Sequence, residues 1–297
     1  MEDVIHSQAL TRNFGRAVAV DHLDLLVPPG TITAFLGPNG AGKTTTIRML
    51  LGLLRPHQGS CRVLGRPPGH PEALARIGAL VEQPSLYDHL TGRENLEITR
   101  LMKHAPRQEV DRVLQLVGLV PVASRPVRTY SLGMRQRLGV ALALVGEPRL
   151  LILDEPNNGL DPEGILEMRE LIRSLARESS VTVFLSSHLL AEVEQVASHA
   201  VVIHRGRLRF QGLMEDMGAP ESEEIQIRLD DAERGTQALG VRGFQSSVEN
   251  GLVRVQAPRD RVPEVVEVLV GGGFSVYEVV PRKPNLEARF MKLVEAP

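Results

Sequence analysis

The stretch Gly37–Thr44, GPNGAGKT, decides the fold class of this 297-residue chain. It has the P-loop spacing, in which glycines let the backbone approach phosphate groups and successive N–H groups point toward them. The apolar run Thr31–Leu36 precedes it and predicts a strand, while Thr45–Ile47 opens a helix. Because a strand leads in and a helix leads out, a phosphate-binding loop is favoured over a structural glycine turn.

Each part of this loop has an expected task. Lys43 is expected to contact the outer phosphates of a nucleoside triphosphate, and Thr44 is expected to ligate Mg²⁺. The positive end of the following helix adds a potential that favours anions. The residues assigned to the nucleotide are Gly37, Pro38, Asn39, Gly40, Ala41, Gly42, Lys43, Thr44 and Thr45.

Two neighbouring carboxylates, Asp154 and Glu155, end a second apolar run that starts at Leu150. Charges at the end of a buried strand are costly unless a cation or a substrate faces them, so Asp154 is expected to reach the Mg²⁺ shell. Successive strand residues point in opposite directions, so Glu155 is expected to polarise the water that attacks the γ-phosphate. Taken alone, the same pair could instead cap the next helix.

Three near-continuous apolar runs organise the first 210 residues: Thr31–Leu36, Leu150–Asp154 and Val181–Ser186. Such runs predict strands buried on both faces of a parallel sheet, whose carboxyl ends collect ligands. Between them, the capping-box spacing at Thr91–Glu94 begins a purely helical pattern, which predicts an inserted helical lobe at about residues 88–147. The predicted fold class is therefore α/β, a P-loop NTPase with an inserted helical lobe.

A second, smaller domain is predicted for residues 222–297, after a first domain of residues 1–218. Gly218–Pro220 and the acidic residues Glu221, Glu223 and Glu224 indicate a linker between the two. The elements predicted beyond it suit a βαββαβ sandwich of the α+β, ferredoxin-like kind. They are strands at Ile225–Leu229 and Phe274–Val280, a hairpin at Phe244–Gln256 that turns at Asn250-Gly251, and helices at Arg261–Leu269 and Leu286–Leu293.

Composition excludes several classes of protein. With 34 Lys+Arg against 36 Asp+Glu, the formal net charge is −2, so a strong electrostatic grip on nucleic acid is not expected. The single cysteine, Cys61, cannot form an intrachain disulfide or a cysteine metal cluster. No apolar run approaches membrane-spanning length, and the start at Met1–Asp3 has no signal-peptide character. We therefore expect any membrane role to come through a partner.

Beyond these features, the first 215 residues or so resemble the ATP-binding subunits of ABC transporters. The stretch Tyr130–Gln136, YSLGMRQ, stands where that family has its Leu-Ser-Gly-Gly-Gln signature. Ser131 and Gly133 keep the phosphate-facing chemistry, and the resemblance implies that they bind ATP held by a second subunit, so that two chains enclose two nucleotides. Standing alone, Ser131 would be an ordinary helix cap. The departures from the family pattern are Tyr130, Leu132 and Met134.

Two further residues match family positions. Gln83 follows the strand-like stretch Ile77–Glu82 and matches the Q-loop, which touches Mg²⁺ or water and leads to the helical lobe. His188 follows the third apolar run and matches the switch histidine, which is expected to hydrogen-bond the γ-phosphate and to hold the attacking water with Glu155. A lone glutamine is more often solvated, and a lone histidine is more often structural.

The resemblance extends to a loop and to an aromatic residue. Asn158–Pro162 resembles the D-loop, which assigns Asp161 to the nucleotide interface, with Asn157 in place of the usual threonine. Phe14 occupies the place of the A-loop aromatic, whose ring stacks on adenine. For Phe14, core packing is the competing interpretation.

These motifs predict an ATPase subunit, with ATP and Mg²⁺ as cofactors, that drives a separately encoded, polytopic membrane permease from the cytoplasmic face of the membrane. It is expected to act as a homodimer or beside a paired ATPase subunit. The variant signature and the small C-terminal domain resemble subunits of drug, antibiotic-peptide or lantibiotic exporters, so export is favoured over uptake. The alternative is a soluble ABC ATPase that acts on ribosomes or nucleic acid. A GTPase is disfavoured because no Asn-Lys-x-Asp element is present.

Overall fold

The computed structural model describes the chain except for residues 1–2, 179–180, 219–222, 283–285 and 296–297. It divides into two compact units, one formed by Met1–Met214 with Phe290–Pro297 and the other by Glu215–Arg289. Helix α11 (Leu286–Glu295) spans this division, whereas the sequence pattern predicts the last helix wholly within the smaller domain. Most of the predicted linker lies outside the described residues, but Glu223 and Glu224 belong to a strand rather than to a linker.

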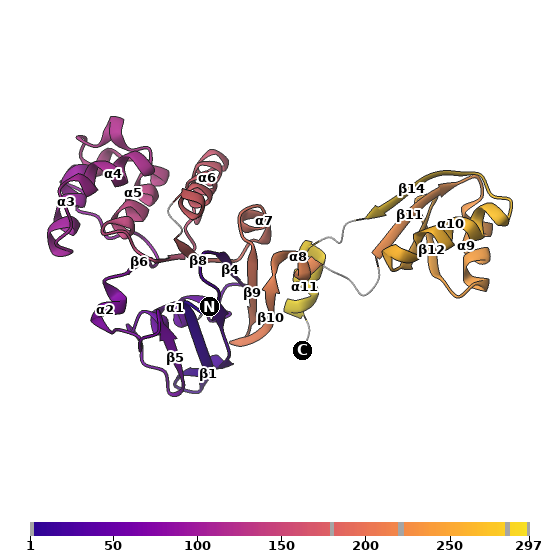
Figure 1. The fold of residues 1–297 in the computed structure, drawn as a ribbon, viewed down its shortest axis with the longest axis horizontal. Coiled ribbons are helices and arrows are strands. Elements are labelled where there is room, and N and C mark those ends of the chain that lie inside the picture. The colour runs from indigo at the N-terminus through magenta and orange to yellow at the C-terminus, as the bar shows by residue number, and fades with distance from the viewer. Residues whose placement is uncertain (1–2, 179–180, 219–222, 283–285, 296–297) are drawn as a thin grey trace. The chain divides into compact units, whose positions relative to one another are not determined.

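The centre of the first unit is a six-stranded sheet with the order β10-β9-β4-β8-β7-β6 (Figure 1). The pairs from β9 to β6 are parallel, and β10 alone runs antiparallel to its neighbour. Their bounds are β4 (Ile32–Leu36), β6 (Ile77–Leu80), β7 (Leu150–Asp154), β8 (Thr182–Ser187), β9 (His199–His204) and β10 (Arg207–Leu213).

The three apolar runs form the middle of this sheet, as predicted. Every residue of β4, β7 and β8 is buried, and the rings of Phe35 and Phe184 pack with their centroids 5.1 Å apart. Because these strands are parallel, their carboxyl ends meet at one edge, where the P-loop, Asp154 and His188 follow them in the chain.

Helices occupy the connections between these strands, and Figure 1 shows α3, α4 and α5 grouped together. The capping box at Thr91 and Glu94 is confirmed: Glu94 N donates to Thr91 Oγ1, and Thr91 N donates to Glu94 Oε2. The helices of the first unit before α11 are α1 (Lys43–Leu50), α2 (Pro71–Leu74), α3 (Gly92–Met102), α4 (Gln108–Leu116), α5 (Leu132–Leu144), α6 (Pro162–Glu178), α7 (Leu190–Val193), and the 3₁₀ turns η1 (Val120–Val122) and η2 (Val127–Thr129).

The carboxyl end of α5 is held by charged side chains from α3 and α4. Lys103, just past α3, donates from Nζ to the carbonyl of Val145 over 2.8 Å, and Arg112 Nη2 donates to the carbonyl of Leu144 over 3.1 Å. Glu109 pairs with Arg112 and accepts a hydrogen bond from Gly146 N. Cations at a helix carboxyl end bind the free carbonyls and interact favourably with the negative end of the helix dipole. This network therefore joins the three helices.

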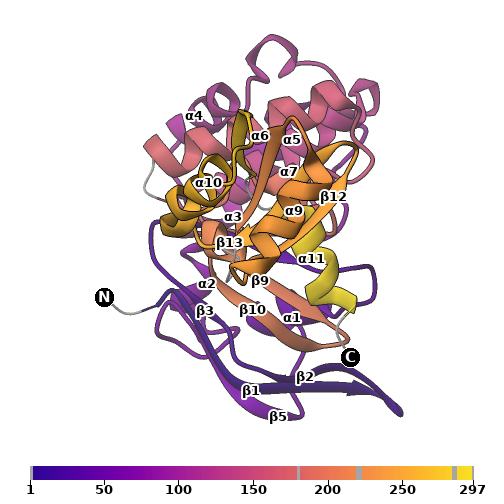
Figure 2. The same cartoon turned by 90° about the vertical axis from the view of Figure 1, so that its right-hand side faces the viewer.

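An antiparallel sheet packs beside the P-loop. In it β1 pairs with β2, β3 and β5, and the long strands β1, β2 and β5 lie together in Figure 2. A Cβ added at Gly42 would overlap the carbonyl oxygen of Ala19 in β2, so this sheet and the P-loop are in contact. The bounds are β1 (Ile5–Phe14), β2 (Ala17–Leu23), β3 (Leu26–Val27) and β5 (Gln58–Val63).

The second unit has a four-stranded antiparallel sheet with the order β12-β13-β11-β14, whose strands alternate with α9 and α10 in the chain order βαββαβ. Its core contains Ile225, Ile227, Val253 and Val255 from the sheet. The predicted turn at Asn250-Gly251 is confirmed, since both residues have positive φ, as a type I′ turn requires. The bounds are α8 (Met214–Gly218), β11 (Glu223–Leu229), α9 (Ala232–Val241), β12 (Gln245–Glu249), β13 (Leu252–Ala257), η3 (Arg259–Arg261), α10 (Val262–Gly271) and β14 (Val276–Arg282).

Among the described residues, no helix combines the length and the apolar character that crossing a lipid bilayer requires.

Candidate active site

The P-loop wraps around the amino end of α1, which begins at Lys43. Gly42 has φ 109°, a backbone region that residues with a Cβ rarely adopt, so glycine is required there for conformation as well as for space. Asn39 and Gly40 lie exposed at the tip of the loop. The buried Lys43 donates from Nζ to the carbonyl of Gly37 over 2.7 Å, which holds its ammonium group against the loop.

The adjacent carboxylates point to different partners. Asp154 is buried, and its Oδ1 accepts a hydrogen bond of 2.6 Å from Ser186 Oγ. Its Oδ2 is also buried but has no hydrogen-bond partner among the described residues. A buried carboxylate oxygen without a hydrogen-bond partner is costly, so Asp154 is suited to act as a ligand of a cation. Thr44 lines the same pocket as Asp154.

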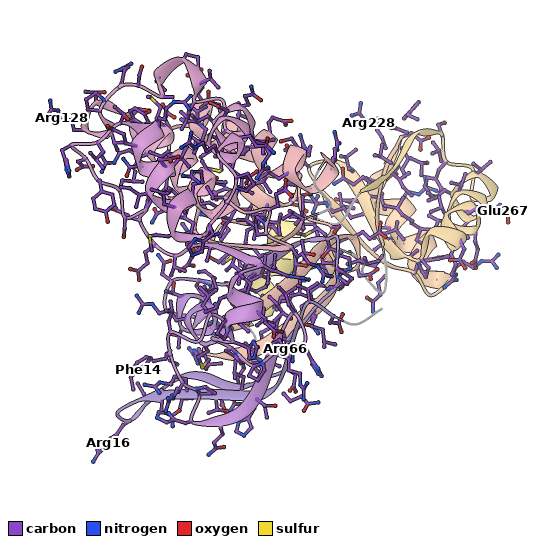
Figure 3. All side chains as sticks on the ribbon, turned by 60° about the vertical axis from the view of Figure 1, so that its left-hand side comes forward. Phe14, Arg16, Arg66, Arg128, Arg228 and Glu267 are labelled. Carbon is purple, nitrogen blue, oxygen red and sulfur yellow. The ribbon has the colours of Figure 1, made fainter. Side chains whose placement is uncertain are left out.

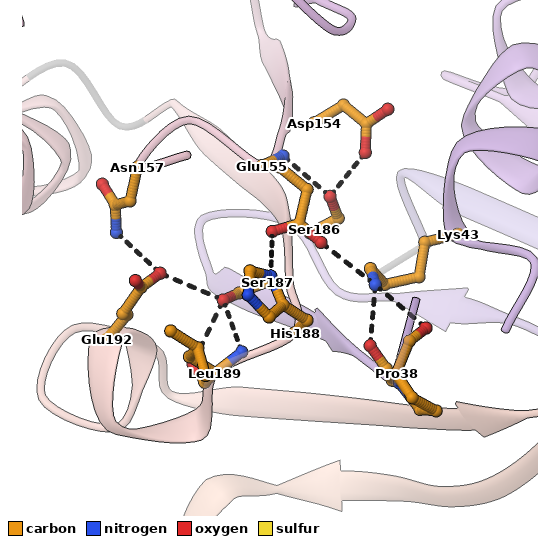
Figure 4. Close-up of polar contacts among 11 residues, drawn as sticks. Pro38, Lys43, Asp154, Glu155, Asn157, Ser186, Ser187, His188, Leu189 and Glu192 are labelled. Atoms are coloured by element: carbon orange, nitrogen blue, oxygen red, sulfur yellow. Dashed lines mark hydrogen bonds and ion pairs between the residues drawn. The ribbon is translucent and has the colours of Figure 1, made fainter. Parts of the chain in front are cut away.

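The carboxylate of Glu155 lies between Lys43 and His188 and contacts both of them (Figure 4). Its Oε1 lies 3.0 Å from Lys43 Nζ, and its Oε2 lies 2.8 Å from His188 Nδ1. The backbone of Glu155 is in the left-handed region, with φ 48°, and its N–H donates to Ser186 Oγ over 2.9 Å. Ser186 therefore contacts both the Asp154 carboxylate and the Glu155 backbone, while Lys43 and His188 share the Glu155 carboxylate.

A pocket of about 320 Å³ opens beside these groups. Gln83, which is expected at the Mg²⁺ or the water, lines this pocket, and His188 does not. Strand β6 ends at Leu80, two residues earlier than expected, because the backbone at Glu82 turns into the left-handed region, with φ 61°. The residues around the pocket are Thr44, Glu82, Gln83, Leu132, Gln136, Asp154, Glu155, Asn158 and Gly159.

A second pocket, of about 390 Å³, brings the signature segment and the D-loop together. Ser131, Gly133 and Asp161 all line it. Ser131 caps α5, because its Oγ accepts a hydrogen bond of 3.2 Å from Met134 N, and Asp161 Oδ1 accepts one of 2.9 Å from Gly164 N at the start of α6. The amino ends of α5 and α6 therefore face the same pocket. Ser131 caps α5 and also lines the pocket in which an anion could bind.

The departure at Tyr130 has a structural reason. Its ring is buried, and its hydroxyl donates to the carbonyl of Val122 over 2.8 Å. A Cβ at Gly92 would overlap this hydroxyl, so the tyrosine fills the space over the first residue of α3. Burial raises the pKa of Tyr130, so the phenol stays protonated and keeps donating. Tyr130 thereby joins the segment before α5 to the start of α3.

Phe14 ends β1 and is 50% exposed, which contradicts the core-packing interpretation. Figure 3 shows it near the tip of the β1–β2 hairpin, where Arg16 also lies. The guanidinium carbon of Arg12 lies over its ring, 5.1 Å from the centroid. The ring is thus free of the core and available to a ligand.

Two site residues were missed by sequence reasoning, Ser186 and Glu192. Glu192 Oε2 accepts hydrogen bonds of 3.2 Å from Asn157 Nδ2 and from Ser187 Oγ, so it joins the segment after Glu155 to the segment before His188 (Figure 4). The signal for Ser186 was present, since it is a polar residue at the carboxyl end of an apolar strand. Glu192 gave no such signal, because acidic residues on short helices are usually solvated.

A P-loop whose lysine meets a carboxylate and a histidine at the carboxyl edge of a parallel sheet defines a P-loop NTPase. The family model described as ABC transporter matches residues 20–158. The chain is 40% identical over 301 residues to the bacitracin transport ATP-binding protein BcrA of Bacillus licheniformis, which covers 99% of this chain and 98% of that protein. The chain therefore belongs to the ABC transporter family of ATP-binding proteins, whose members hydrolyse ATP to power transport.

Other comparisons agree. The lantibiotic transport ATP-binding protein SrtF of Streptococcus pyogenes is 40% identical over 218 residues, which cover 73% of this chain and 93% of that protein. The solved structure of cbiO1 from Clostridium perfringens, part of the ABC transporter complex cbiONQ, matches with a TM-score of 0.66 and 25% identity over 73% of this chain and 90% of that one. The resemblance and the P-loop fold predicted from the motifs are confirmed, and the chain is an ATPase.

Proposed function

We propose that this ATPase drives a separately encoded membrane permease that exports an antibiotic peptide of the bacitracin or lantibiotic type. The observation that carries the ATPase part is the position of Glu155 between Lys43 and His188. Full-length similarity to a bacitracin transport protein supports the substrate class. Attachment to the permease would hold the chain at the cytoplasmic face of the membrane.

The residues around the pocket fit an Mg²⁺ ion together with the triphosphate. Asp154, with its unpaired buried oxygen, would hold the ion with Thr44 and Gln83, which line the same pocket. When bound, Mg²⁺ neutralises charge on the phosphate oxygens. Lys43 and the loop N–H groups bind the phosphates, and Phe14 stacks on adenine.

Glu155 is proposed as the general base and His188 as its companion. A carboxylate can accept a proton from water, and the 2.8 Å contact with His188 Nδ1 fixes its orientation. With nucleotide bound, His188 is proposed to hydrogen-bond the γ-phosphate and to hold the water on the side of Glu155.

Two chains are proposed to enclose two nucleotides. The pocket shared by Ser131, Gly133 and Asp161 presents two helix amino ends, which attract anions, to the nucleotide of the second subunit. Whether that subunit is a second copy or a paired ATPase, each complete site needs groups from both chains. Helices α3 to α5 are proposed as the inserted helical lobe, and the βαββαβ unit as a ferredoxin-like accessory domain.

The test uses the source strain and three variants. A tagged Glu155→Gln chain, which should remain loaded with ATP, is expected to copurify a polytopic membrane protein. A strain that carries Lys43→Ala in place of the native chain is expected to stop growing at a lower bacitracin concentration, equal to that of a strain in which the gene is deleted. A strain that carries Arg16→Met, on an exposed hairpin turn, is expected to keep the native resistance. Retention of ribosomes or DNA without a membrane protein would favour the soluble alternative instead.

A further inference from the structure

The guanidinium group that lies over Phe14 is held in place by groups other than the ring. Arg12 Nη1 donates to the carbonyl of Arg55 over 2.7 Å. Its Nε is buried and has no hydrogen-bond partner in the described part of the chain. The backbone next to it is fixed as well, because Asn13 N donates to His57 Nδ1 over 3.1 Å. The position of the cation is therefore set by the segment between α1 and β5.

The same hairpin reaches the P-loop. Phe14 pairs with Ala17 across the turn, and the carbonyl of Ala19, two residues further along β2, packs against Gly42. At a rise of about 3.3 Å per residue, the backbone opposite Phe14 lies roughly 7 Å along the strand from that contact. A nucleotide whose phosphates lie in the loop can therefore reach the ring with its base.

We propose that Arg12 is a positioning residue for nucleotide recognition: it covers one face of the Phe14 ring and holds the other face toward the base. A cation over one face of an aromatic ring is attracted by the π electrons, and it restricts the ring without adding a direct contact to the ligand. The base then stacks on the face that Arg12 leaves open. This inference rests on the proposed role of Phe14 in adenine binding.

The test compares ADP, which carries the base, with inorganic pyrophosphate, which does not. Arg12→Met keeps the length of the side chain but removes the cation, and it is expected to raise the dissociation constant of Mg-ADP about threefold to tenfold. The dissociation constant of Mg-pyrophosphate should not change. Arg16→Met, on the exposed turn that follows Phe14, removes the same charge nearby and is expected to leave both constants unchanged.

Two further variants separate the inference from the function on which it rests. Phe14→Ala should weaken Mg-ADP at least as much as Arg12→Met, and adding Arg12→Met to it should cause no further loss. If Phe14→Ala leaves Mg-ADP binding unchanged, the proposed adenine site is wrong. If Phe14→Ala weakens binding but Arg12→Met does not, or if Arg12→Met weakens pyrophosphate equally, only the positioning role is refuted. Should Arg12→Met fail to fold, Arg12→Lys decides, with a smaller loss confined to Mg-ADP.

Discussion

Replacing Glu155 with glutamine tests the central contact of the site. Glutamine has the same shape, so its carbonyl oxygen can stay near Lys43 and its amide nitrogen near His188 Nδ1, which then accepts a hydrogen bond. The amide cannot take a proton from water, and general bases contribute about 10² to 10⁴ in rate. Turnover of ATP is therefore expected to fall by about that factor while the fold is kept.

The same substitution is expected to tighten nucleotide binding. Without ligand, Lys43 Nζ lies 3.0 Å from Glu155 Oε1, with the lysine side chain 6% exposed and the glutamate 20%. Outer phosphates must draw the ammonium group away from this carboxylate. A hydrogen bond between charged groups contributes about 1.5 to 3 kcal/mol, and we take the lower value because Glu155 is partly solvated. Because the glutamine oxygen keeps only a neutral hydrogen bond to Lys43, most of this competition is lost, and the dissociation constant of the triphosphate should fall by up to about tenfold.

The assay measures how tightly the native protein and Glu155→Gln bind the Mg²⁺ complex of the β,γ-imido analogue of ATP, which neither of them hydrolyses. Glu82→Gln is the matched control, since Glu82 lines the same pocket but pairs with Arg48 instead of Lys43. It should change affinity less than twofold. Unchanged or weaker binding by Glu155→Gln would refute the competition argument, and near-normal hydrolysis would remove Glu155 from its proposed role as base.

Two other predictions concern assembly and stability. Mixing Ser131→Arg with Lys43→Ala chains should restore some ATPase activity that neither variant shows alone, because one shared site of the mixed dimer stays intact; normal hydrolysis by a strictly monomeric Ser131→Arg chain would contradict shared sites. Glu109→Gln should cost about 2 kcal/mol and roughly 5 °C of melting temperature at pH 7, because it breaks the ion pair between the buried Glu109 and the partly exposed Arg112. Arg112 holds the pKa of the Glu109 carboxyl below its ordinary value, so this advantage is complete above the unfolded-state pKa and disappears as pH falls through the folded-state pKa. A melting difference that stayed constant from pH 7 into the acid range would exclude the pair as its cause.

The sequence predicts those site residues whose position follows from the strand that directly precedes them in the chain. Lys43, Asp154 and His188 each follow an apolar run at a short distance, and parallel strands carry such residues to the same edge. Ser186 gives the same signal at the end of its strand, but its partner could not be predicted. Its contact with Asp154 depends on the register that pairs the two residues across β7 and β8, and register between distant strands is not encoded in either segment alone.

Other differences arise from local backbone and tertiary contacts. The strand before Gln83 ends early because Glu82 adopts a left-handed conformation, which its residue type does not predict. Phe14 could not be assigned to core or surface from its hydrophobicity, because apolar residues occur in both places. The role of Asn157, which replaces the usual threonine, could not be predicted either, because its hydrogen-bond partner Glu192 lies 35 residues away in the chain.

The contact between Tyr130 and Gly92 has a consequence for the order in which substitutions can accumulate. As long as the phenol occupies the space above α3, any larger residue at position 92 would displace it. A side chain at position 92 is therefore expected to be tolerated best once the tyrosine has been replaced by a shorter residue. The two positions are far apart in the chain but should change as a pair, in that order, so ancestral sequences with tyrosine at 130 are expected to have glycine at 92.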